Sequence, residues 1–252
     1  GYGISIEGPG SEGLGVYVKL TNLRIAGATG QVDIGIALNR MTYTTIENST
    51  IIDSQIAVSL YASDHNQISQ LNVERSARGV MLESSGDNSL LSSSISSCGV
   101  AVWIRGPNNR VSQNRITACT AGVNVDGDGG RSANGNVIEG NTIADGGQGA
   151  YGIALYKVQD SLITGNTVTG MGWGIALADS SSGNTISHNT VLENKRSGIY
   201  VSSGSSNNMI TLNTLHGNGD GVSSFDLQEE NNPGLNVWKN NQFDTRSRDD
   251  IG

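Results

Sequence analysis

The chain has few of the features that mark the commoner protein classes. No stretch of about 18 apolar residues occurs, so the sequence predicts no membrane-spanning helix. Its formal net charge is −8, which argues against the basic surface that binds nucleic acids. Only three of the 252 residues are prolines and only 5% are aromatic, whereas 35 are glycines. No segment shows helical periodicity, and this composition is typical of a β structure with many turns.

One phrase recurs along most of the chain. It reads N-x-φ-x-x-N-x-φ, where φ is apolar, and it is complete in NRVSQNRI (109–116), NVIEGNTI (136–143), NTISHNTV (184–191) and NMITLNTL (208–215). Counting variants, its first apolar residue recurs at steps of 22, 22, 21, 27, 25, 23, 24 and 28 residues. Such a period indicates stacked repeats. The positions counted are Ile46, Ile68, Leu90, Val111, Ile138, Ile163, Ile186, Ile210 and Trp238.

A second phrase alternates with the first. Its pattern of small, apolar, any and apolar residues is seen in GIAL (35–38), AVSL (57–60), GVML (79–82), AVWI (101–104), GVNV (122–125), GIAL (152–155), GIAL (174–177) and GIYV (198–201). Alternation over four residues predicts a short strand. A leucine-rich repeat would need a leucine-dominated consensus, which is absent. We therefore predict an all-β fold, a single-stranded right-handed parallel β-helix (solenoid) of about ten coils. We expect one domain, residues 1–252, without its N-terminal cap.

The repeat assigns the columns of the solenoid. Six asparagines should stack in a structural ladder, since amides one coil apart can hydrogen-bond and asparagine tolerates the left-handed backbone of a tight turn. These are Asn114, Asn141, Asn166, Asn189, Asn213 and Asn241. A second column comprises Asn66, Asn88, Asn109, Asn136, Asn184, Asn208 and Asn236. The apolar residues of the second phrase should fill the interior.

The two cysteines, Cys98 and Cys119, occupy the same position in adjacent repeats. They should therefore lie one above the other, in a column that also contains Ser54 and Ser76. A stacked pair is near disulfide range, so a column of small residues and a disulfide bridge both fit.

These phrases resemble those of the pectin-lyase-like right-handed parallel β-helix superfamily, in particular its NosD-type and carbohydrate-binding branch, over about residues 30–243. The resemblance implies a secreted, periplasmic or cell-surface protein that handles polysaccharides as a lyase, hydrolase or epimerase, or as a non-catalytic accessory module. The epimerase segment resembling Tyr-Gly-Phe-Asp-Pro-His is absent here, as is a clear equivalent of the polygalacturonase aspartates. The partner that this resemblance implies is a polysaccharide or oligosaccharide.

Candidate site residues lie on the outward side of the second phrase. Rings and charges on successive coils resemble a sugar-binding face, and they equally fit an exposed ion-pair ladder. If the protein is an enzyme, Glu83 or Asp126 would act as acid or base, and Arg105 or Lys157 as base or charge neutraliser. The predicted substrate-binding residues are Tyr61, Trp103, Tyr156 and Arg131.

The loop at 126–136 should roof this face, because inserted loops often mark the working side of a solenoid. Its residues Asp126 and Asp128 leave calcium open as a ligand, although their spacing misses the EF-hand template. The three histidines, His65, His188 and His216, lack the spacing of metal ligands. We expect no cofactor. A polysaccharide-active enzyme, a glycan-binding module and a structural spacer all remain open, as does the oligomeric state.

Overall fold

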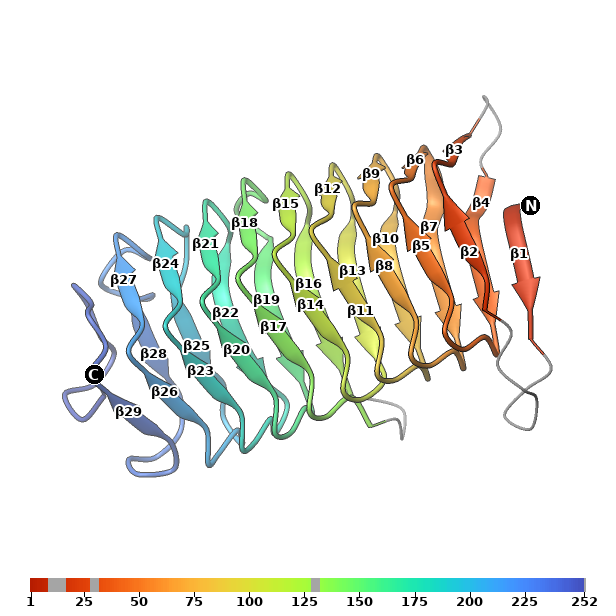
Figure 1. Ribbon diagram of the computed structural model, residues 1–252. Helices are drawn as coiled ribbons and strands as arrows, with labels where there is room; N and C mark the ends of the chain where they lie inside the picture. The colour runs from red at the N-terminus through yellow and green to blue at the C-terminus, as the bar shows by residue number, and fades with distance from the viewer. Residues whose placement is uncertain (9–16, 28–31, 128–131, 252) are drawn as a thin grey trace.

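The computed structural model describes residues 1–8, 17–27, 32–127 and 132–251. In these ranges the chain winds into a solenoid built from three parallel sheets, with no helix (Figure 1). The predicted all-β parallel solenoid is thereby confirmed. The estimate of about ten coils slightly overcounts the complete ones, because the last coil, with β28 and β29, has no strand in the third sheet within the described ranges.

The three sheets run the length of the solenoid. The first contains β1 (Tyr2–Glu7), β4 (Val32–Asn39), β7 (Ser54–Tyr61), β10 (Arg78–Glu83), β13 (Val100–Arg105), β16 (Ala121–Asp126), β19 (Tyr151–Tyr156), β22 (Trp173–Ala178), β25 (Ile199–Val201) and β28 (Leu227–Glu229). The second contains β2 (Lys19–Thr21), β5 (Thr45–Glu47), β8 (Gln67–Ser69), β11 (Ser89–Leu91), β14 (Arg110–Ser112), β17 (Val137–Glu139), β20 (Leu162–Thr164), β23 (Thr185–Ser187), β26 (Met209–Thr211) and β29 (Val237–Lys239). The third contains β3 (Arg24–Ala26), β6 (Thr50–Ile52), β9 (Asn72–Glu74), β12 (Ser94–Ser96), β15 (Arg115–Thr117), β18 (Thr142–Ala144), β21 (Thr167–Thr169), β24 (Thr190–Leu192) and β27 (Thr214–His216).

Equivalent residues of successive coils pair in register, so each inward position becomes a continuous apolar column. In the first sheet, for example, Val80 pairs with Val102 and Leu82 with Ile104. All four side chains are at most 1% exposed. The second and third sheets each contribute one such column, and burial of these columns supplies the main driving force for folding.

The asparagines of the first column hydrogen-bond in succession along the solenoid. Asn114 donates from Nδ2 to Oδ1 of Asn141 at 3.0 Å, and the same bond links each later member to the next. Each Oδ1 also accepts the backbone N–H of the residue one coil earlier, as Asn141 Oδ1 does from Asn114. These side chains therefore satisfy turn amides that would otherwise be buried without partners.

The sequence suggested two reasons for asparagine in this column, and one of them, the left-handed backbone conformation, does not apply. The positive φ angles fall on the preceding residue of each turn, such as Gln113 at 57° and His188 at 56°. The column asparagines are absent from that conformation. Their side-chain hydrogen bonds, which link each coil to the next, account for the repeat instead.

Cys98 and Cys119 lie one above the other, as predicted. The Cys119 Sγ accepts the backbone N–H of Cys98 at 3.3 Å, and both thiols are free and buried. Further along the same column the sulfur of Met171 accepts the N–H of Gly146, and Asn194 Oδ1 accepts that of Met171. The cysteines are thus members of a third column of buried acceptors.

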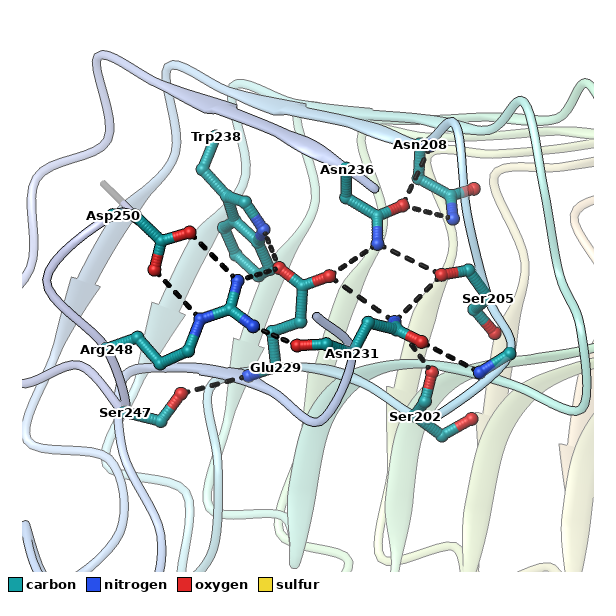
Figure 2. Close-up of polar contacts among 11 residues, drawn as sticks. Ser202, Ser205, Asn208, Glu229, Asn231, Asn236, Trp238, Ser247, Arg248 and Asp250 are labelled. Carbon is teal, nitrogen blue, oxygen red and sulfur yellow. Dashed lines mark hydrogen bonds and ion pairs between the residues drawn. The ribbon is translucent and has the colours of Figure 1, made fainter. Parts of the chain in front are cut away.

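Two columns end at a buried carboxylate near the C-terminus. In the second column, Asn236 donates to Oε1 of Glu229 at 2.6 Å (Figure 2). In the third, Asn218 donates to Oδ1 of Asp226 at 2.7 Å. Arg248, from the segment after β29, pairs with Glu229 at 3.1 Å. The segment that follows the last strand is therefore fixed to the final coil by charge-assisted hydrogen bonds.

Candidate functional site

The predicted site residues follow one outward edge of the first sheet. Glu83 pairs in register with Tyr61 on one side and Arg105 on the other, and Asp126 pairs with Tyr156. Trp103 lies two residues before Arg105 in β13 and pairs in register with Met81 on one side and Asn124 on the other. The structure thus brings these side chains together in the order that the repeat predicted.

The charged members of this row are engaged with one another. Arg105 lies 3.8 Å from Glu83 and 3.4 Å from Asp126, and all three side chains are 16–21% exposed. The guanidinium also lies 5.2 Å from the centroid of the Trp103 ring, while that of Arg78 lies 4.7 Å from it. We call Arg78, Glu83, Trp103, Arg105 and Asp126 the arginine–tryptophan cluster. Its charges are compensated internally, as in an ion-pair ladder.

The remaining predicted residues contribute less to this cluster. Lys157 is exposed, has a positive φ of 54°, and follows directly after β19. Tyr61 is 48% exposed at the other end of the row. Arg131 and Asp128 lie outside the described residues.

A groove opens further along the same sheet, above β19, β22, β25 and β28. Its volume is about 570 Å³. Of the predicted residues that the structure describes, only Tyr156 lines this groove. The lining consists of Gln148, Tyr151, Tyr156, Trp173, Ala176, Ala178, Lys195, Arg196, Ser197, Tyr200, Asp220, Ser223, Ser224, Gln228 and Glu230. We call this the aromatic groove.

Alanines create the floor of the aromatic groove. Ala176 pairs in register with Tyr200, and Ala178 pairs with Tyr156. Because each tyrosine has a methyl group as its neighbour in the adjacent coil, space is left beside its ring. The sheet spacing of about 4.8 Å would otherwise be filled by a larger side chain. Burial raises the pKa of Tyr156 to about 12, with the neighbouring Tyr151 contributing less.

One end of the aromatic groove is formed by a stack of rings. Tyr151 and Trp173 are paired residues of adjacent strands, and their rings are parallel within 4° with centroids 4.6 Å apart. The guanidinium of Arg196, one coil further, lies 4.3 Å from the Trp173 ring centroid. The indole is therefore held between a phenol and a cation, an arrangement that fixes all three side chains.

The carboxylates of the groove are already engaged. Asp220 Oδ1 accepts the backbone N–H groups of Val222, Ser223 and Ser224 at 2.8–3.0 Å, and these bonds hold the pKa of Asp220 well below its usual range. Burial and the nearby Glu230 carboxylate raise the pKa of Tyr200. The Ser197 hydroxyl donates to the Gln228 side chain.

The sequence did contain a signal for this groove. The phrases AYGIAL (150–155) and GWGIAL (172–177) place an aromatic residue directly before the strand pattern and alanine at its outward position. The outward residue of the strand and the residue after it carry rings and charges mainly in the middle coils, so these two positions alone favour the middle of the chain. Lys195, Arg196 and the loop around Asp220 come from turns whose place beside the sheet required the fold.

Comparisons with known proteins agree with this architecture. The family described as "Periplasmic copper-binding protein (NosD)" matches residues 104–247, and the family described as "Right handed beta helix region" matches residues 2–133. The chain belongs to the right-handed β-helix family. It also belongs to the NosD family, and the two matches together cover most of this β-helix protein. No curated protein matches it.

Several solved structures share the fold. A tailspike protein mutant of E. coli bacteriophage HK620 in complex with a pentasaccharide aligns with a TM-score of 0.71 at 11% identity, over 94% of this chain and 48% of the tailspike. The DFA-IIIase from Arthrobacter chlorophenolicus A6 in complex with GF2 aligns with a TM-score of 0.68 at 12% identity, over 94% of this chain and 75% of that enzyme. This β-helix chain spans about half the length of the tailspikes that it matches.

The name of the NosD family raises the question of a copper site. No group of three or more His, Cys, Asp or Glu side chains that could hold a metal ion occurs among the described residues. The thiols of Cys98 and Cys119 are bonded to carbonyl oxygens of their own coils. The described residues therefore do not form a copper site of three or more His, Cys, Asp or Glu ligands. No helix in the described ranges is long and apolar enough to cross a membrane.

Proposed function

We propose that this β-helix protein binds an extended oligosaccharide in the aromatic groove, as a secreted, periplasmic or cell-surface protein. The observation that carries the proposal is the alanine floor between Tyr156 and Tyr200. It leaves a space of about 570 Å³, within the range of about 300–1,000 Å³ that is usual for ligand sites. No cofactor is needed for such binding.

The groove has the chemistry that sugars require. The phenol rings beside the alanines present apolar surface to the C–H face of a pyranose ring. Polar groups of Gln148, Gln228 and Ser224 lie around the same space and suit sugar hydroxyls. The groove runs across several coils of an open sheet, so a chain of sugars can extend beyond either end. The tailspike structure was determined in complex with a pentasaccharide, which agrees with the proposal.

Replacing Tyr156 by alanine is expected to weaken oligosaccharide binding by about 1–3 kcal/mol, because a ring that anchors the ligand would be lost. Tyr61→Ala is the matched control, since Tyr61 occupies the same column of the same sheet outside the groove. Binding would be measured by calorimetry on oligosaccharides selected from a glycan array, with circular dichroism to verify the fold.

The floor provides a second, independent arm of this test. Ala176→Leu should fill the space between the tyrosines and abolish binding, whereas Ala37→Leu lies in the same column, in β4, and should not. Unchanged affinity in both Tyr156→Ala and Ala176→Leu would rule out the aromatic groove as the binding site.

Binding is favoured over turnover by the arginine–tryptophan cluster. Glu83 and Asp126, the predicted acid and base, both lie within 4 Å of the Arg105 guanidinium. Carboxylates that are engaged with the same cation suit an ion-pair ladder, a structural role. Catalytic roles for Glu83, Arg105, Asp126 and Lys157 thus remain predictions of the sequence.

The double substitution Glu83→Gln with Asp126→Asn is expected to leave both glycan binding and the fold intact. Neither residue lines the aromatic groove. Product analysis by chromatography, on any glycan that the wild-type protein is found to cleave, would measure turnover. Loss of cleavage in the double variant with retained binding would establish the catalytic assignment, and would show that the protein is an enzyme rather than a binding module.

A further inference from the structure

Two cations stand at the rim of the aromatic groove with no carboxylate partner. Lys195 and Arg196 lie in the turn between β24 and β25, where their backbone N–H groups donate to Met171 O at 2.8 Å and Gly172 O at 2.7 Å. Both side chains are exposed, and neither forms an ion pair within the part of the chain that the structure describes. In a protein of net charge −8, two adjacent unpaired cations at a groove are unusual.

The carboxylates of the same groove do not neutralise them. Asp220 is bonded to the N–H groups of its own loop, and Glu230 lies beside the Tyr200 phenol. No distance within 4.0 Å joins either carboxylate to Lys195 or Arg196 among the described residues. The hydrogen-bonding capacity of the two cations is therefore available to a ligand.

The geometry points to a ligand whose sugars carry an acidic group, held by Lys195 and Arg196 while a neighbouring ring lies over the alanine floor. This inference rests on the proposed function, because it assigns the substrate class of the same groove. Arginine offers a planar fork of donors that matches carboxylate or sulfate, and lysine adds a point charge. A carboxylate and a sulfate ester share this recognition chemistry.

The stack at the groove end positions Arg196 for this role. The guanidinium carbon of Arg196 lies over the Trp173 ring, 4.3 Å from its centroid, and this contact holds the cation at the end of the groove. The low pKa of Asp220 keeps a negative charge in the adjacent loop, so an acidic group would be repelled there and directed toward the Trp173 end. The ligand should consequently bind in one orientation.

Three oligosaccharides of equal length test the inference: an oligogalacturonate, a sulfated galactan fragment and the neutral galactan fragment. Calorimetry on the wild-type protein should show at least about tenfold tighter binding of one acidic fragment than of the neutral one, declining with salt. The two acidic arms distinguish a carboxylate from a sulfate.

Charge removal locates the effect. Lys195→Met should reduce the preference, and Lys195→Met with Arg196→Gln should remove it, so that the double variant binds the acidic and the neutral fragments with equal affinity. Lys239→Met, an exposed lysine on β29 outside the groove, is the matched control.

The outcomes separate the two proposals. Equal affinity for acidic and neutral fragments, with binding still lost in Ala176→Leu, would overturn the acidic substrate class and leave the proposed function standing. A preference that survives removal of both cations would also overturn the inference. Failure of all three fragments and of a glycan array to bind would overturn the proposed function and the inference together.

Discussion

Replacing Arg248 by methionine is expected to destabilise the C-terminal coil by about 3–5 kcal/mol, the usual cost of removing one partner from a buried ion pair. The Glu229 side chain is 1% exposed, and its Oε2 lies 3.1 Å from Arg248 Nη2. The same oxygen accepts from the indole Nε1 of Trp238 at 2.7 Å (Figure 2). Without Arg248, a buried carboxylate would be left with neutral donors alone.

Hydrogen exchange of the amides of β28 and β29 would measure this effect, together with denaturation in guanidinium chloride. Arg75→Met is the matched control, because Arg75 and Asp53 form an exposed pair at 2.8 Å whose loss should change stability far less. Adding Glu229→Gln to the Arg248 variant should recover part of the stability, since the uncompensated charge is removed. Equal protection in Arg248→Met and the wild-type protein would contradict the assignment of this pair as a structural element.

The fold could be predicted from the sequence because the same pattern of apolar residues and asparagines recurs in successive coils. Each coil repeats the same buried positions, so a single misread position changes little. Columns such as Val80, Val102 and Val123 follow directly from spacing and lie fully buried in register. The asparagine positions were visible for the same reason. Of the two reasons expected for them, side-chain hydrogen bonding applies and the left-handed backbone does not, because both favour the same residue type in a turn.

The site was less predictable because it arises from departures from the repeat. The sequence predicted that the side chains from Tyr61 to Tyr156 lie on successive coils, as they do. Such a row of side chains does not by itself form a groove. What creates the space is the pair of alanines at 176 and 178, beside which Tyr156 and Tyr200 remain. Small residues in a sequence do not by themselves predict a cavity, since the side chains next to them in the fold determine whether the space is filled.

The columns also explain why a closed C-terminal end matters. Except at Asn109 and Asn136, which donate to carbonyl oxygens of their own or the preceding coil, the linked amides of a column donate to the next coil and accept from the coil before, so the end of the column is a place for an acceptor. The second column ends on Glu229 and the third on Asp226, whose other oxygen accepts the backbone N–H groups of Asp244 and Thr245. A carboxylate suits this position because it accepts only and takes several donors at once. The carboxylate at the column end and the hydrogen bonds between amides within the column should therefore each contribute a measurable part of the free energy of unfolding.

Continuity within a column is tested by Asn166→Ala, which should lower the free energy of unfolding by about 1–3 kcal/mol, since one buried donor is left without its acceptor. Asn166 is fully buried and donates to Ile138 O and to Asn189 Oδ1, at 2.9 and 3.0 Å. Its Oδ1 accepts both N–H and Nδ2 of Asn141. Alanine leaves the backbone N–H of Asn141 without its acceptor, whereas Asn141 Nδ2 keeps its bond to Val111 O and Asn189 Oδ1 still accepts the backbone N–H of residue 166.

Asn72→Ala is the matched control for this variant. The Asn72 side chain is half-buried on the outward side of β9 and donates to Glu74 at 3.1 Å, so its removal should change stability by no more than about 0.5 kcal/mol. Denaturation in guanidinium chloride, followed by circular dichroism, compares the two. Asn166→Asp adds a third point, because it keeps the accepting oxygen and the shape but loses the donor and buries a charge, and it should be at least as destabilising as alanine at neutral pH. If Asn166→Ala were as stable as Asn72→Ala, the amide columns would be incidental to the fold, and the apolar columns alone would have to hold adjacent coils in register.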